Sequence, residues 1–405
     1  MIAPRRGKMA AILEDGVRLR CATSLLLLIL SVFVITGSKF ATATERVFQT
    51  AELTASDGVS GDDFGYSVAS GLDLLAIGAP YAGGNGAVYL FRDSEGSWQQ
   101  IAKLTSSDGA KGQFGFSVAI AGNTVAVGSP TQAGGAVYVF VKPPSGWADM
   151  TETAKLTNDG GGFGQGVAVN SNGSVVLAGA IFSEAAYAFR MPPGGWVNMT
   201  APSATLVTPE NTRLSGSALA ISKNIVVGGG TIGNPGEPNA VFVFDLLSGS
   251  QTINSTATLT LSDGGAFGFS VAIDDDTVVA GAQIHNGNRG AVFVFVEPNG
   301  GWTDMTQTAE LDVPAFGALG AAVDISKNAI VAGAPSGKEL GFAVAYLKPQ
   351  TGWTNTSSPD YWGTSSEGSQ SEAFGQAIAL QGRAVAVGNF FGANGLGAVY
   401  MFGGN

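Results

Sequence analysis

The chain has 405 residues, of which 60 are glycine and only 13% are charged. Glycine is about twice as frequent as its average of roughly 7%, and together with many β-branched residues it suits short strands joined by tight turns. The formal net charge is −11. An acidic surface repels nucleic acid and anionic lipid, which excludes both as partners.

The first 43 residues differ in composition from the rest. Basic residues precede an apolar run, Leu25 to Ile35, and small residues follow at Ala41-Thr42-Ala43. This pattern predicts a secretory signal peptide over residues 1–43, with residues 44–405 as a secreted, extracellular or cell-surface domain. An uncleaved signal anchor is the alternative, although the run is short for a span of about 20 residues.

Removal of this segment would change the chemistry of the chain. The only cysteine, Cys21, lies in it, so the mature chain would have no disulfide and no thiolate metal site. Six basic and two acidic residues would leave with it, giving a net charge of −15. No second apolar run of spanning length follows, so we expect no membrane span after cleavage.

One short pattern recurs through the mature chain: Phe-Gly followed by a strand of small apolar residues. Clear copies begin at Phe64, Phe114, Phe163, Phe267 and Phe374, and weaker ones at Ser215 and Leu319. The steps between copies are 49 to 55 residues. A fixed period of this length is the signature of a repeat architecture, and here it gives seven units.

Each unit contains four pieces typical of strands. In the second unit they are Phe116 to Ile120, Thr124 to Gly128, Ala136 to Val141 and Thr153 to Leu156. A four-stranded antiparallel sheet repeated about every 50 residues is a propeller blade. The sequence therefore predicts an all-β fold, a seven-bladed β-propeller with four-stranded antiparallel blades.

The recurring string has a physical explanation in this fold. First strands crowd around one axis, which favours small side chains, and Gly115 lets backbones approach closely. Phe114 offers a large apolar face for packing between neighbouring sheets. The last unit stops after its third strand, and Val47 to Leu53 is similar to a fourth strand. We expect this N-terminal strand to complete the last blade and close the ring.

These residues resemble the FG-GAP repeat family, which includes the seven-bladed head of integrin α chains. The first unit carries the full signature, Phe64-Gly65 followed by Gly78-Ala79-Pro80. The resemblance implies an extracellular recognition or adhesion module. Integrin-type blades often carry a calcium loop, Asp-x-Asp-x-Asp-Gly, between the first two strands. Those turns are too short here to wrap a cation that needs six to eight oxygens, so the family's calcium sites do not carry over.

No cofactor is expected, and one acidic turn is the only weak candidate for a cation. Asp274, Asp275 and Asp276 have the right chemistry but not the loop, and we interpret them as a solvated hairpin turn.

Strand direction divides the loops between two faces. The 1–2 and 3–4 loops lie on one face, and the 2–3 and 4–1 loops on the other. N-glycan acceptor patterns occur at Asn172, in a 1–2 turn, and at Asn198, Asn254 and Asn355, which we place in 3–4 loops. Glycans there would leave the 2–3/4–1 face bare. Chance placement in polar loops is the alternative.

The bare face carries the candidate ligand-binding residues, and exposed aromatics beside carboxylates suit recognition of a protein or a glycan. The alternatives are packing between blades for the Phe-Phe pair and a turn role for the Asp-Asp pair. The candidates are Asp62, Asp63, Tyr81, His285, Arg289, Phe390 and Phe391.

Four tryptophans recur after glycine in 3–4 loops, and this period indicates packing against the outer strand. They are Trp147, Trp196, Trp302 and Trp353. Trp362 follows Trp353 by nine residues, the interval that separates Trp147 from Leu156, so we expect it to replace a fourth-strand leucine.

Enzymatic chemistry has little support in the sequence. His285 is the one histidine, so neither a nucleophile–histidine system nor a zinc cluster is indicated. A carboxylate pair could still serve a carbohydrate-active hydrolase, which is the alternative function. A structural component of a wall or matrix is a third. Recognition or adhesion without catalysis is the preferred interpretation.

Overall fold

The computed structural model describes residues 44–109, 112–131, 134–159, 161–233, 238–314, 317–335, 341–366 and 373–403. The predicted signal peptide, residues 1–43, lies outside the described residues. Within these ranges, no helix has both the length and the apolar character that a membrane crossing requires.

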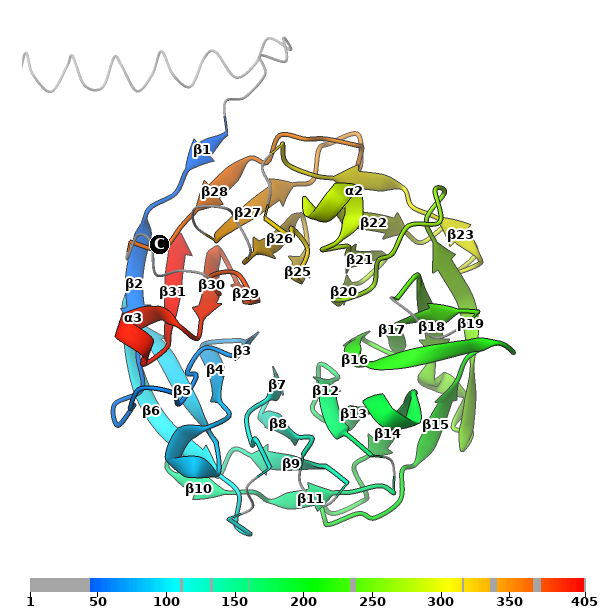
Figure 1. Ribbon diagram of the computed structural model, residues 1–405. Helices are drawn as coiled ribbons and strands as arrows, with labels where there is room; N and C mark the ends of the chain where they lie inside the picture. The colour runs from blue at the N-terminus through cyan, green and yellow to red at the C-terminus, as the bar shows by residue number, and fades with distance from the viewer. Residues whose placement is uncertain are drawn as a thin grey trace, which may run out of the picture. The chain divides into compact units, whose positions relative to one another are not determined.

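The described part of residues 44–405 is an all-β propeller of small antiparallel sheets arranged around one axis (Figure 1). Among the described residues, each innermost strand contacts the next around the ring, and the last contacts the first. In order, these strands are β3 (Ser67–Gly71), β7 (Ser117–Ala121), β12 (Phe163–Val169), β16 (Thr212–Ser222), β20 (Val271–Asp274), β25 (Ala322–Ser326) and β29 (Ala377–Gln381).

Each innermost strand begins a four-stranded antiparallel group, which we call a unit and name by that strand. The β3 unit continues with β4 (Leu74–Ala79), β5 (Ala87–Ser94) and β6 (Ser97–Thr105); the β7 unit with β8 (Thr124–Ser129), β9 (Ala136–Val141) and β11 (Ala154–Leu156); the β20 unit with β21 (Thr277–Gly281), β22 (Val292–Val296) and β24 (Ala309–Leu311); and the β25 unit with β26 (Ala329–Ala334), β27 (Phe342–Leu347) and β28 (Tyr361–Gly363).

Two units share one nine-stranded sheet. The β12 unit contains β13 (Val175–Ala180), β14 (Ala185–Arg190) and β15 (Ala204–Val207), and the β16 unit contains β17 (Ile225–Ile232), β18 (Ala240–Asp245) and β19 (Thr252–Thr260). Parallel pairing of β15 with β19 joins them, and β23 (Met305–Thr306) adds to β19. The short strands β1 (Glu45–Arg46) and β10 (Met150–Thr151) likewise pair in parallel with β28 and β6.

The last unit contains strands from both ends of the propeller. It comprises β29, β30 (Ala384–Asn389), β31 (Ala398–Gly403) and β2 (Gln49–Leu53). Leu53 of β2 lies opposite Val399 of β31 in an antiparallel pair, which agrees with the expected closure by the N-terminal strand. A further bridge joins Phe64, before β3, to Gly397, before β31. The pairing gives β31 a partner on each side, and β2 becomes the outer strand of the sheet.

The phenylalanine of each Phe-Gly pair is a core residue between neighbouring units. Phe114 is fully buried, and its ring meets those of Tyr138 and Phe140 edge-on at centroid distances of 5.3 and 5.9 Å. Leu90 of the preceding unit belongs to the same apolar cluster. The expected packing of this residue between neighbouring sheets is confirmed.

The two glycines of the repeat form one contact between neighbouring units. Gly115 has φ of +95°, and its N–H donates to the carbonyl of Gly128 in its own unit at 3.1 Å. The carbonyl of Gly115 faces Gly78 of the preceding unit, where an added Cβ would lie 2.1 Å from the oxygen. Ser67 Oγ donates to the same carbonyl at 2.8 Å. Only glycine fits at Gly78, because the neighbouring backbone occupies the place of a side chain.

This glycine contact recurs around the whole ring. In each case the added Cβ would lie 1.9–2.2 Å from the carbonyl oxygen of the next unit. The further pairs are Gly128 with Gly164, Gly179 with Gly216, Gly229 with Gly268, Gly281 with Gly320, Gly333 with Gly375, and Gly388 with Gly65.

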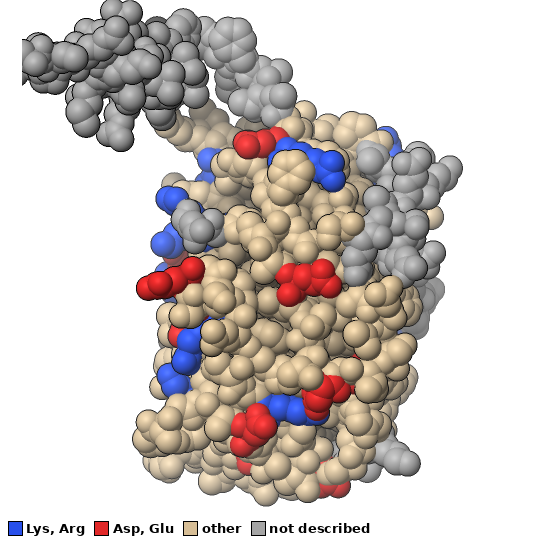
Figure 2. Space-filling model, turned by 90° about the vertical axis from the view of Figure 1, so that its left-hand side faces the viewer, with Lys and Arg blue, Asp and Glu red and all other residues tan. Residues whose placement is uncertain are grey.

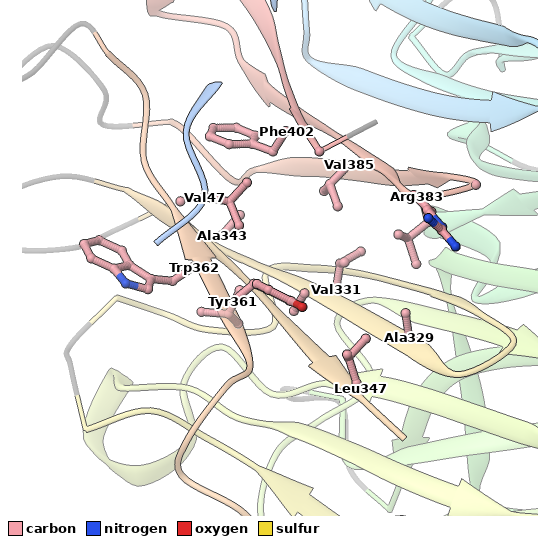
Figure 3. A pocket seen from close by; sticks show the side chains of 16 residues that line it. Val47, Ala329, Val331, Ala343, Leu347, Tyr361, Trp362, Arg383, Val385 and Phe402 are labelled. Carbon is pink, nitrogen blue, oxygen red and sulfur yellow. The ribbon is translucent and has the colours of Figure 1, made fainter. Parts of the chain in front are cut away.

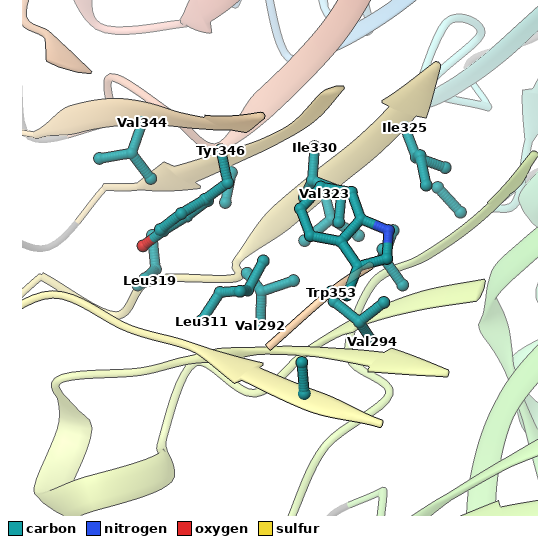
Figure 4. Close-up of a cluster of buried hydrophobic side chains, with 14 of the residues drawn as sticks. Val292, Val294, Leu311, Leu319, Val323, Ile325, Ile330, Val344, Tyr346 and Trp353 are labelled. Atoms are coloured by element: carbon teal, nitrogen blue, oxygen red, sulfur yellow. The ribbon is translucent and has the colours of Figure 1, made fainter. Parts of the chain in front are cut away.

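The tryptophans of the 3–4 loops also lie between units. Trp147, Trp196 and Trp353 are buried, and each belongs to a cluster that spans two units. Figure 4 shows Trp353 among Val292, Val294 and Ile330. We expected these tryptophans to pack against the outer strand. In the structure each tryptophan packs against strands of its own unit and of the preceding unit.

The expectation for Trp362 is wrong. Leu104 lies opposite Val88, and the matching pair in the β25 unit is Gly363 opposite Ala343. Trp362 lies opposite Val344, one position earlier, because the loop after Trp353 is one residue longer than the matching loops of the β7 and β20 units. A one-residue shift turns a strand residue to the other face of its sheet.

We predict that Gly128→Ala lowers the free energy of unfolding by about 1–3 kcal/mol, since a Cβ at this position would lie 2.0 Å from the Gly164 carbonyl oxygen. Gly122→Ala is the control. Gly122 lies in the hairpin turn of the same unit with φ of +56°, where an added Cβ meets nothing closer than 3.5 Å. Urea unfolding of the variants measures both effects, and equal midpoints would contradict the glycine contact.

Candidate functional site

The face formed by the 2–3 and 4–1 loops carries a cluster of aromatic rings where the last unit meets the first two. The Tyr66 ring lies 4.9 Å from that of Phe116 and 5.4 Å from that of Phe390, and Phe390 lies 4.4 Å from Phe391. Phe391 is 52% exposed. We call Tyr66, Phe116, Phe390 and Phe391 the aromatic patch.

Local sequence explains how the patch forms. Tyr66 and Phe116 each follow a Phe-Gly pair, at the entry to an innermost strand. Phe390 follows β30 at the position that Pro80, Pro130 and Pro335 take in other units, and Phe391 is the next residue. The glycine contacts bring these strand ends close to the axis, so their next side chains meet. Sequence reasoning singled out the Phe-Phe pair but missed Tyr66 and Phe116, whose bulk among otherwise small residues was the available signal.

Polar groups border the patch on the side of the β3 unit. Tyr81 is 46% exposed, and its hydroxyl accepts a hydrogen bond from Gln113 Nε2 at 2.6 Å. Partial burial raises the pKa of Asp63, and the negative charge of Asp62 raises it further. Burial also raises the pKa of Tyr66, and Tyr81 and Asp63 contribute to the increase. The structure therefore brings Asp63 and Tyr81 to the edge of the patch.

Asp62 has a different environment from its neighbour. Its side chain is buried, and Oδ2 accepts a hydrogen bond from the Val59 N–H at 2.9 Å. The Tyr81 N–H donates to the Asp62 carbonyl at 3.3 Å. Asp62 thus holds the loop that presents Asp63 and Tyr81.

His285 and Arg289 lie apart from the patch, in the β20 unit. His285 begins the short helix α2 (His285–Asn288), and its ring stands perpendicular to that of Phe293 at 5.1 Å. Its Nε2 lies 3.7 Å from Asp263 Oδ2 and 3.6 Å from Glu310 Oε1. Arg289 Nε donates to the Asn286 carbonyl at 3.3 Å. The structure does not bring these residues together with the other five candidates.

His285 replaces part of an arrangement that two other units share. In the β3 unit, Asp57 accepts hydrogen bonds from the Tyr89 hydroxyl at 2.9 Å and from Lys103 Nζ at 2.5 Å. The bond from Lys103 is the main cause of the lowered pKa of Asp57.

The β7 unit repeats this arrangement with Asp108, Tyr138 and Lys155. In the β20 unit the positions of tyrosine and lysine hold Phe293 and Glu310, and the imidazole lies between the two carboxylates.

Comparison with known proteins identifies the repeat. The family model described as FG-GAP repeat matches residues 47–91, 98–140 and 253–295. This is an FG-GAP repeat protein. No curated protein matches the chain. The FG-GAP matches include Tyr66 and Phe116 but not the Phe-Phe pair, and they leave the ligand open.

The opposite face of the FG-GAP propeller carries the predicted N-glycan acceptors. Asn172 is exposed in the turn between β12 and β13. Asn198 and Asn355 lie in 3–4 loops, and their side-chain oxygens accept hydrogen bonds from the backbone N–H groups of Lys155 and Glu310 in the preceding unit. Asp149 and Asp304 make the equivalent bonds elsewhere.

Asn254 corrects the loop assignment, because it lies within strand β19. That strand begins two residues before it, where β19 pairs with β15 of the neighbouring unit. Glycosylation at all four asparagines stays a prediction.

The acidic turn of the β20 unit distributes its carboxylates among separate partners. Asp274 Oδ2 accepts the Lys327 N–H at 2.5 Å, Asp275 pairs with Lys223 at 2.8 Å, and Asp276 Oδ1 accepts the Thr277 hydroxyl at 2.8 Å. In the ranges that the structure describes, no group of three His, Cys, Asp or Glu residues could hold a metal ion.

One half-buried carboxyl on an innermost strand has a raised pKa. Asp324 of β25 accepts hydrogen bonds from the N–H groups of Leu380 and Ile325 at 2.7 and 2.8 Å. Burial raises its pKa to about 6 despite these bonds, and the charge of Asp274 adds to the increase.

We predict that raising the pH from about 4 to above 6 lowers the free energy of unfolding more in the wild-type protein than in the Asp324→Asn variant. The folded state holds a proton on Asp324 that the unfolded chain, with an ordinary carboxyl pKa, has already lost. The difference is on the order of 1–3 kcal/mol. Urea titrations at pH 4 and pH 7 measure it, and an equal change in both proteins would contradict the assignment.

Proposed function

We propose that the protein is a secreted or cell-surface recognition module, a seven-bladed propeller that binds a protein or glycan through the aromatic patch. FG-GAP repeats in a β-propeller fit a ligand-binding or recognition module. The observation that carries the proposal is the exposure of large aromatic side chains beside Asp63 on the 2–3/4–1 face.

The blade count rests on the units rather than on the number of hydrogen-bonded sheets. The nine-stranded sheet consists of two four-stranded antiparallel groups, and their link is a short parallel pairing at the outer edge. The same parallel link joins β10 to β6, whose units form separate sheets. Counting the β12 and β16 units separately gives seven, in agreement with the seven sequence copies.

The chemistry of the patch suits an extended ligand. Phe391 and Tyr81 expose about half of their surfaces, and exposed aromatic rings are enriched at binding sites where one side is apolar and the other wet. Charged side chains are few on the outer side of the ring, around β2 and β31 (Figure 2). At the patch the main exposed groups are aromatic rings, so affinity would come from stacking and hydrogen bonds more than from ion pairs.

A non-catalytic role accords with how the candidate acid–base groups are used. Asp62 binds backbone within its own loop, and His285 lies between two carboxylates of its unit. General acid–base catalysis needs a group free to reach a substrate proton. No contact among the described residues favours the hydrolase alternative.

We predict that Phe391→Ser weakens ligand binding at least tenfold, because aromatic side chains at the centre of an interface commonly contribute more than about 1.4 kcal/mol. A glycan array and a pull-down from extracellular matrix first identify the ligand, and calorimetry then measures affinity. Phe182→Ser is the matched control: Phe182 is 82% exposed on the same face of the β12 unit.

Two results would contradict the proposal. One is unchanged affinity in Phe391→Ser, or an equal loss in the Phe182→Ser control. The other is turnover of a labelled polysaccharide by the wild-type protein, which would favour the hydrolase.

A further inference from the structure

A cavity of about 530 Å³ lies between the β25 unit and the last unit. Figure 3 shows its walls, with Ala329 and Val331 of β26 on one side and Val385 and Phe402 of the last unit on the other. Almost all of the lining is apolar. The volume lies within the range of roughly 300–1,000 Å³ that is typical of small-molecule sites.

The corresponding space is filled at other junctions. Between the β3 and β7 units, Trp147 from the 3–4 loop packs in one cluster with Ile120, Val125 and Phe140. The positions of those three residues in the last unit are taken by Leu380, Val385 and Phe402, which line the cavity. Other junctions receive Trp196, Leu246 and Trp353 in the same way.

Topology explains why this junction differs. Its filling residue would come from a loop between the third and fourth strands of the last unit, which are β31 and β2. Because β2 precedes β3 in the chain, no loop leads from β31 into it. Val385 is consequently part-exposed, whereas its counterpart Val125 is fully buried.

Smaller residues in the β25 unit enlarge the space further. Ala345 lies between Val331 and Tyr361 of the neighbouring strands. In the β3 unit the same position is held by Leu90, which lies between Ala76 and Ala102. Ala329 takes the place of Leu74 in the same way. Val331 and Tyr361 are larger than their counterparts Ala76 and Ala102 and occupy part of this space, so the cavity corresponds mainly to the position of an indole.

Two polar groups border this apolar space. Arg383, in the exposed turn between β29 and β30, lines the cavity and has no ion-pair or hydrogen-bond partner among the described residues. The Tyr361 side chain points into the cavity (Figure 3). A guanidinium at the rim of an apolar slot suits a carboxylate on an otherwise apolar ligand.

We propose that this cavity binds a planar bicyclic aromatic acid, with the ring system in the position that Trp147 takes between the β3 and β7 units and the carboxylate at Arg383. Both sites use the last unit, but none of the residues that line the cavity belongs to the aromatic patch, so the site stands or falls independently of the proposed recognition function.

The test uses the full chain with 2-naphthoate and its neutral analogue 2-naphthamide, measured by calorimetry. Wild-type protein binds both, with naphthoate the tighter. Ala345→Leu, which places in the cavity the residue that the β3 unit has there, weakens both at least tenfold. Arg383→Gln weakens naphthoate five- to tenfold and leaves naphthamide unchanged.

Lys142→Gln is the matched control, because it removes one positive charge after β9, at a junction that Trp147 fills. It leaves both affinities unchanged. Ala329→Val replaces Ala345→Leu if circular dichroism shows that the latter fails to fold. Absence of saturable binding to wild-type protein, or unchanged binding in a folded cavity-filling variant, overturns the site. If wild-type protein binds naphthoate no tighter than naphthamide, and Arg383→Gln leaves both affinities unchanged, the role of the carboxylate is overturned.

Discussion

The ring depends on a backbone contact between neighbouring units: the carbonyl of the glycine before each innermost strand, or at its start, lies against a glycine in the second strand of the unit before it. An added Cβ there would lie about 2 Å from an oxygen at every junction. Because the contact uses backbone alone, it fixes the spacing of the innermost strands without depending on the side chains around it. The faces, the aromatic patch and the cavity all follow from that spacing.

This constraint explains which parts of the repeat persist. The two units that have lost both residues after the glycine of Gly-Ala-Pro still have glycine at Gly229 and Gly388, where the neighbouring carbonyl leaves no space. The proline that follows has gone from both, since it only ends a strand. At Asn389-Phe390-Phe391 the released positions carry the aromatic side chains of the patch. Among the units of this chain, the residues beside the glycine therefore differ most, because the backbone there stays fixed while the side chain can change.

The sequence predicted the propeller because the spacing of Phe-Gly pairs reflects a repeated backbone contact. Strand β9 was predicted with both bounds correct, and β7 was shifted by one residue. Trp362 was misplaced because one extra loop residue changes strand register without altering composition. The partners of His285 were not predictable either, since Asp263 and Glu310 lie in other strands and loops and meet it only when the unit folds. Tyr66 and Phe116, about 50 residues apart, meet for the same reason.

Closure with a strand from the other end of the chain has two opposite consequences. It places β31 between β30 and β2 and so prevents β31 from acting as a free edge. It also separates the third and fourth strands of that unit in sequence, and the loop that delivers an indole to other junctions cannot exist there. Tight packing at this junction would need large residues from the strands themselves, yet Ala329, Ala345 and Gly363 are small. The junction between the β25 unit and the closing unit is thus one where the strands leave room for a ligand.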